Sequence, residues 1–144
     1  MIEQDTIRLL RECDAGIKMG VSSLEQVMDY AKNEKLRNIL TKSKIDHEKV
    51  KEEIQAMLDN FHDDGKNPNP LIQKMSQVKT SMGLMVNDAD YKIADIMTDG
   101  CNMGIKSLSK YLNEYKAASE ESKYITRKVI KIEEKLSRDL REFL

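Results

Sequence analysis

A nine-residue segment with two glycines occurs twice in the chain and restricts the folds that it can form. Gly16-Ile-Lys-Met-Gly-Val-Ser-Ser-Leu24 returns 84 residues later as Gly100-Cys-Asn-Met-Gly-Ile-Lys-Ser-Leu108. Both copies lie where apolar residues recur every three or four positions, which predicts a helix. A glycine inside a helix costs about 1 kcal/mol relative to alanine. We therefore expect close helix contacts at the four glycines, Gly16, Gly20, Gly100 and Gly104; the alternative is a duplication in which they are merely tolerated.

The composition indicates a single helical domain. Of the 144 residues, 34% are charged and only 5% aromatic, with nine Met and no Trp, so the core must consist of Leu, Ile, Val and Met. Lys plus Arg (24) nearly balances Asp plus Glu (25), and the two signs are interspersed. This pattern favours neither a nucleic-acid partner nor a polybasic membrane face. Long apolar runs around the glycines are missing as well, so we expect no membrane insertion.

The N-terminus and the cysteines bear on the compartment. Met-Ile-Glu-Gln-Asp lacks the basic and then apolar design of a signal peptide. Two cysteines without a disulfide framework are typical of a reducing compartment. We expect a cytoplasmic protein.

The apolar pattern predicts four long helices in one domain, residues 1–144. They span about residues 2–32, then 34–61 after an Asn33 cap, then 89–116, and finally a segment that follows a Ser119 cap. Asp63-Asp-Gly-Lys-Asn-Pro-Asn-Pro70 interrupts the pattern, and residues 71–86 form a shorter apolar stripe. We predict a first hairpin over 2–63, a crossover with a short extra helix over 64–87, and a second hairpin over 88–144.

Two similar hairpins joined by one long connection indicate an all-α, ferritin-like four-helix bundle. The alternative is an up-down-up-down bundle with short loops. The crossover has 24 residues, whereas helices in bundles are usually joined by about 2 to 8. The ferritin-like order is therefore the one we expect.

The metal chemistry of ferritin-like bundles is not predicted. Their di-metal centres take a Glu from each of two helices and a Glu-x-x-His from each of the other two. Here the first and third helices carry Cys13, Ile17 and Cys101 on the expected core stripe, and Lys44 stands three residues before His47. We predict no di-iron site, no cofactor and no enzymatic activity.

Four residues remain weak candidates for a site: His47, Cys13, Cys101 and Glu133. His47 is the ionisable group on a predicted core stripe, and it has three readings. It is a histidine satisfied by a neighbouring carboxylate or carbonyl, a remnant metal ligand with one of the cysteines, or a pH-sensitive partner of Glu133. The cysteines have a plainer reading as small buried hydrophobes.

The methionines of the crossover suggest a contact surface. Met75, Met82 and Met85 lie on one apolar stripe. Methionine side chains repack easily, which suits either a core or an adaptable surface for a partner or an apolar ligand.

Several segments resemble a known group of proteins. They are Ile93-Ala-Asp-Ile-Met-Thr-Asp-Gly-Cys-Asn-Met-Gly-Ile105, Leu112-Asn-Glu-Tyr-Lys116, Ser81-Met-Gly-Leu-Met85 and the closing residues 132–144. They are similar to small uncharacterised helical proteins of anaerobic Firmicutes, and the repeated hairpin resembles ferritin-like bundles described as domains of unknown function. The resemblance implies a fold and brings no catalytic residues.

Three functions follow as expectations. The first is a non-enzymatic bundle that acts through association, as a homo-oligomer or with another protein. The second is a degenerate ferritin-like metal or redox protein that uses His47 and a cysteine. The third is a carrier of a small apolar ligand.

Overall fold

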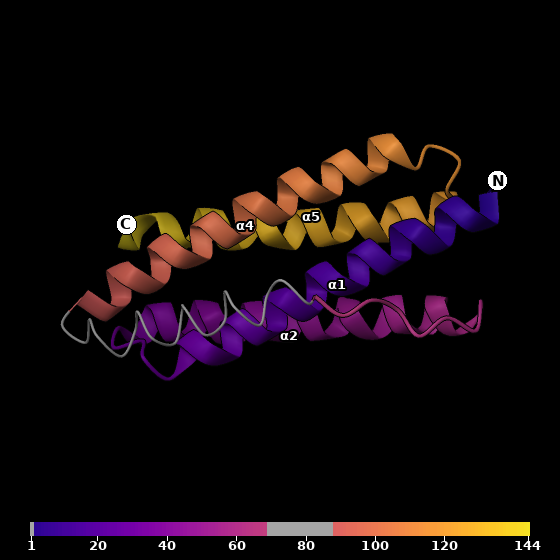
Figure 1. Ribbon diagram of the computed structural model, residues 1–144. Helices are drawn as coiled ribbons and strands as arrows, with labels where there is room; N and C mark the ends of the chain where they lie inside the picture. Colours follow the sequence, from indigo (N-terminus) through magenta and orange to yellow (C-terminus); the bar gives the residue numbers. More distant parts are fainter. Residues whose placement is uncertain (1, 69–87) are drawn as a thin grey trace.

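The computed structural model describes residues 2–68 and 88–144, and these form four long helices. They are α1 (Ile2–Met28), α2 (Glu34–Asp59), α4 (Ala89–Glu114) and α5 (Glu120–Leu140), followed by the short 3-10 helix η2 (Arg141–Phe143). Figure 1 shows them as long rods without a strand in the described ranges. The prediction of an all-α fold with four long helices is confirmed. The predicted crossover helix and its Met75, Met82 and Met85 lie outside the described residues.

The predicted helix caps are present. Asn33 precedes α2, and its side-chain oxygen accepts a hydrogen bond from the Leu36 N–H at 3.2 Å. Ser119 precedes α5, and its hydroxyl oxygen accepts from the Ser122 N–H at 3.1 Å. Each cap satisfies a backbone donor that the first helical turn leaves without a partner.

Hydrogen bonds at the two ends of the molecule fix the direction of α4. At one end, the N–H groups of Lys32 and Asn33, between α1 and α2, donate to the carboxylate of Asp90 at 2.7 and 3.1 Å. Asp90 lies in the first turn of α4. The start of α4 is therefore held beside the α1–α2 connection.

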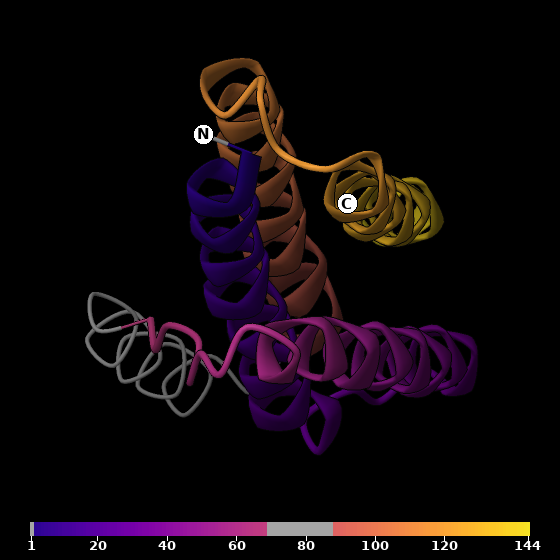
Figure 2. The same cartoon turned by 90° about the vertical axis from the view of Figure 1, so that its right-hand side faces the viewer.

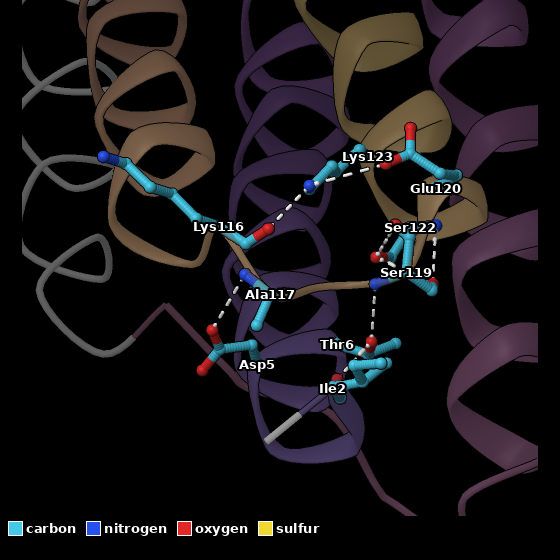
Figure 3. A network of polar contacts seen from close by, with 9 residues as sticks. All are labelled: Ile2, Asp5, Thr6, Lys116, Ala117, Ser119, Glu120, Ser122 and Lys123. Carbon is cyan, nitrogen blue, oxygen red and sulfur yellow. Dashed lines mark hydrogen bonds and ion pairs between the residues drawn. The ribbon is translucent and has the colours of Figure 1, made fainter.

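The opposite end is closed by the connection between α4 and α5. The Ser119 N–H donates to the hydroxyl of Thr6 at 2.8 Å, and the Ala117 N–H donates to Asp5, both on α1 (Figure 3). Thus α4 runs antiparallel to α1 and parallel to α2, as Figure 1 also shows. An up-down-up-down bundle requires α4 to begin where α2 ends, so that alternative does not fit.

The core consists of two apolar clusters stacked along the bundle. In the end-on view, α1 lies beside α4, while α2 and α5 lie to one side of this pair (Figure 2). One cluster gathers around Leu24, Leu36, Ile93 and Leu136, and the other around Leu10, Ile54, Leu108 and Val129. Among the described residues, no helix is both long and apolar enough to cross a membrane.

The chain after α2 folds back onto α1 around a buried carboxylate. Asp14 is fully buried, and it accepts from the Lys66 N–H at 3.0 Å and pairs with Lys18 at 2.7 Å. Gly65 has a φ of +84°, and a Cβ there would collide with the carboxylate of Asp14. The sequence placed Gly65 in the segment that interrupts the apolar pattern, but it did not reveal the buried Asp14.

Candidate functional site

A buried histidine and a buried glutamate meet between the two apolar clusters. His47 on α2 is 0% exposed and Glu133 on α5 is 8% exposed. The Nε2 atom of His47 lies 2.6 Å from Oε1 of Glu133. On α2, residues of one cluster precede His47 and residues of the other cluster follow it. On α5, the two clusters likewise lie on either side of Glu133. The pair therefore forms a polar layer between the two clusters.

The surroundings of His47 favour the charged imidazolium. Its Nδ1 lies 2.7 Å from the carbonyl oxygen of Ser43, which can only accept, so Nδ1 carries a proton. Its Nε2 faces a carboxylate. Burial is the largest influence and lowers the pKa of His47, but the hydrogen bond and charge of Glu133, with smaller contributions from Ser43 and Asp46, outweigh it. The net pKa of His47 is raised, which favours an imidazolium that donates from both nitrogens.

One glycine of each repeat faces this pair. A Cβ on Gly20 would lie 2.7 Å from Cδ2 of His47 and 3.4 Å from Oε1 of Glu133. A Cβ on Gly104 would lie 4.0 Å from the carboxylate of Glu133. The missing side chain of Gly20 therefore makes room for the imidazole ring, which lies where we expected a close helix contact.

The other glycine of each repeat has a different environment. Among residues 2–68 and 88–144, a Cβ on Gly16 or Gly100 would meet no atom within 4 Å apart from the local helix backbone and adjacent residues. Within the described residues no close contact is therefore present at these two glycines, and the expected helix contact there stays a prediction. Helical periodicity placed each pair of glycines on one face, but it could not show how far away the neighbouring helix lies.

The two cysteines lie in different places and are poor nucleophiles. Cys101 belongs to the cluster that contains Leu136, and burial together with the nearby Glu133 raises the pKa of its thiol. Cys13 belongs to the other cluster, where its sulfur lies 3.0 Å from the hydroxyl of Thr126. Burial raises the pKa of Cys13 to about 12. Thiols held in the protonated form are unreactive.

The contacts of His47 bear on whether the described residues could hold a metal ion. Both ring nitrogens of His47 are engaged with oxygen acceptors, whereas a histidine ligand must offer an unprotonated nitrogen. Of the other candidates, Glu133 is beside His47 and Cys101, while Cys13 lies apart from them. Within residues 2–68 and 88–144, no three His, Cys, Asp or Glu side chains are grouped so that they could hold a metal ion. The chemistry of the layer is that of a buried ion pair.

A second feature lies on the surface, in a groove between α2 and α5. Two adjoining hollows, of about 700 and 350 Å³, share Asp46, Ile132 and Lys135. The groove between α2 and α5, which we call the α2–α5 groove, comprises both hollows. Its apolar lining is Ile39, Val50, Ile132 and Leu136.

The sequence contains a row of lysines that marks this groove, but the balance of positive and negative charge over the whole chain does not show it. Lys35, Lys42 and Lys49 recur every seven residues on α2, so they share one helix face. All three line the groove. Reading charge along each helix face, in place of the overall balance, would have found this row.

Comparison with known proteins gives no relative from which a role can be taken. No family model matches the chain, and no curated protein and no solved structure matches it.

Proposed function

We propose that this protein is a non-enzymatic helical bundle that acts through protein association, and that the α2–α5 groove is its contact surface. One observation carries the proposal: the groove has an apolar floor on the outside of the molecule, lined by helices from both hairpins. Grooves of this kind between two helices are common docking sites for a further helix.

The interior supports a structural role for its polar groups. His47 and Glu133 bind each other, and the cysteine thiols are held protonated. A catalytic base or nucleophile needs a pKa close to the working pH and access to a substrate. The described interior residues instead form an inert ion pair and inert thiols. We therefore propose that the function lies on the surface.

The bundle order supports a ferritin-like plan without its chemistry. The parallel arrangement of α2 and α4 is what a ferritin-like bundle with one crossover requires. We propose that residues 64–87 form this crossover, as the sequence indicates. On this proposal, the level where such bundles carry metal ligands holds the His47–Glu133 pair.

Cross-linking from a single position tests the association. A photoreactive amino acid replaces Lys49 in the groove, and in a matched control it replaces Lys106, an exposed lysine of α4. In the cells that produce the protein, we expect a discrete cross-linked adduct from position 49 and none from position 106. Sedimentation velocity of the purified chain then shows whether the partner is a second copy.

The contrary results are equally definite. The proposal is wrong if position 49 gives no adduct and the chain sediments as a monomer at high micromolar concentration. An apolar small molecule that copurifies with the chain and protects the groove from labelling would favour the carrier alternative. Stoichiometric metal in protein purified without an affinity tag would favour the metal alternative.

A further inference from the structure

We infer that the α2–α5 groove binds an acidic amphipathic helix of a partner protein. This inference rests on the proposed function and adds the chemistry of the partner. It follows from three properties of the groove: an apolar floor, two rows of basic residues and a length that suits a helix of several turns.

The floor provides the apolar contacts. Ile39 and Val50 come from α2, and Ile132 and Leu136 come from α5. Val50 and Leu136 are buried in the core, whereas Ile39 and Ile132 are only partly buried and pack against its two clusters. A partner helix with apolar residues three and four positions apart would cover the exposed parts of Ile39 and Ile132.

The wall on α5 is a basic row. Lys128, Lys131, Lys135 and Arg138 follow one another at intervals of three, four and three residues, so they lie along one face of the helix. All four line the groove. Lys128 pairs with Glu53 across the groove at 3.0 Å, which joins the two walls at that point.

The wall on α2 repeats the pattern. Lys35, Lys42 and Lys49 lie on one face at intervals of seven residues. Lys42 and Lys49 are exposed, as are Lys131 and Lys135 on the facing wall. These four lysines can therefore reach carboxylates on the two flanks of a docked helix.

The charge of the groove differs from that of the chain. Its lining contains seven basic and five acidic residues, whereas the whole chain has 24 basic and 25 acidic residues. Two of the five acidic residues, Glu53 and Glu142, are already paired with Lys128 and Lys35. The remaining excess of positive charge is complementary to an acidic partner. The apolar floor favours a helix over a nucleic acid, whose backbone offers no apolar face.

The groove has a suitable length. Its lining on α2 extends from Lys35 to Glu53, which corresponds to about 27 Å of helix at 1.5 Å per residue. A partner helix of about 18 residues has the same length.

Peptide binding to the whole chain tests the inference. The probe is a fluorescent helical peptide of about 18 residues, with Leu along one face and Glu on both flanks. A matched peptide carries Lys in place of every Glu. The test variant is Lys131→Glu with Lys135→Glu, and the control is Lys106→Glu with Lys110→Glu, which makes the same change at exposed positions of α4. Fluorescence anisotropy gives the affinity, and circular dichroism verifies that each variant is folded.

We expect the acidic peptide to bind and the basic peptide not to bind. The α5 variant should weaken binding by at least about tenfold, since each charge pair at an interface can contribute this much. The α4 variant should leave the affinity unchanged. Equal binding of the two peptides, no binding of the acidic peptide, or equal effects of the two variants would overturn the inference. Tight binding of a single-stranded oligonucleotide that excludes the acidic peptide would overturn it in favour of a nucleic acid.

These outcomes are separate from those of the cross-linking experiment. If position 49 cross-links to a protein but the acidic peptide does not bind, the proposed function stands and the inferred partner chemistry is wrong. If neither occurs and the chain sediments as a monomer, both are wrong.

Discussion

Nε2 of His47 on α2 lies 2.6 Å from Oε1 of Glu133 on α5, and this contact joins the two hairpins in the interior of the bundle. The pair separates two apolar clusters, so a shift of α2 along α5 would place a charged group against apolar side chains. Buried polar groups are known to fix the register of helices at some cost in stability. We assign this role to the His47–Glu133 pair.

Removing one partner of the pair should be costly. Glu133→Ala leaves a buried imidazolium without its acceptor, and we expect a loss of about 3–5 kcal/mol in the free energy of unfolding. Replacing both partners, with His47→Leu and Glu133→Leu, should recover most of that loss because no unpaired polar group remains. Urea unfolding of His47→Leu, Glu133→Leu and the double variant measures the coupling; purely additive effects would show that the two residues are independent.

Stability should fall as the pH rises above neutrality. The pKa of His47 is raised in the folded chain above its ordinary value of 6.5. The stabilisation that the charged His47 contributes is therefore fully present below pH 6.5 and is lost as the pH rises through the folded pKa. Over that range the free energy of unfolding falls by at most about 1.4 kcal/mol per pH unit. Urea midpoints measured across this range should show the decline in the native chain and not in the double Leu variant. An equal decline in the native chain and the double Leu variant would show that other ionisable groups cause it.

The four glycines should respond differently to alanine. Gly16→Ala and Gly100→Ala meet no neighbour among the described residues, so each should gain about 0.5–1 kcal/mol from helix propensity. Gly104→Ala should also be tolerated. Gly20→Ala forces its Cβ against an imidazole ring that is held at both nitrogens, and it should lose about 1–3 kcal/mol. Thermal unfolding ranks the four variants; a gain at Gly20 would show that His47 moves aside easily.

Gly65 should tolerate no side chain. Its positive φ and its contact with Asp14 make Gly65→Ala unfavourable for two reasons, and we expect a loss of at least about 1 kcal/mol. Gly100→Ala is the matched control for the effect of a glycine-to-alanine change elsewhere. A stable Gly65→Ala variant would mean that residues 60–68 can leave α1 without affecting the core.

The sequence predicts the helices well because their signals are local. The apolar intervals and the caps at Asn33 and Ser119 depend on neighbouring residues, and these gave the correct helices and starts. The contacts between side chains of different helices were predicted less well. Helical periodicity identified His47 and pointed to Glu133, but not the 2.6 Å contact between them. Asp14 was missed because its burial depends on a loop more than 50 positions away in the sequence.

The contacts of the glycines are hard to predict for the same reason. A missing side chain shows where space is available, but the neighbour that occupies it comes from another helix. At Gly20 that neighbour is an imidazole ring, and at Gly16 and Gly100 the part of the chain that the structure describes supplies none within 4 Å.

The most direct test of the account is the protonation state of His47, measured by nitrogen NMR of the imidazole ring at neutral pH. We predict a proton on both Nδ1 and Nε2, loss of one only above pH 6.5, and no change when zinc is added. A neutral ring with one bare nitrogen that shifts on addition of zinc would contradict it, because the interior would then hold a metal ligand in place of a structural ion pair.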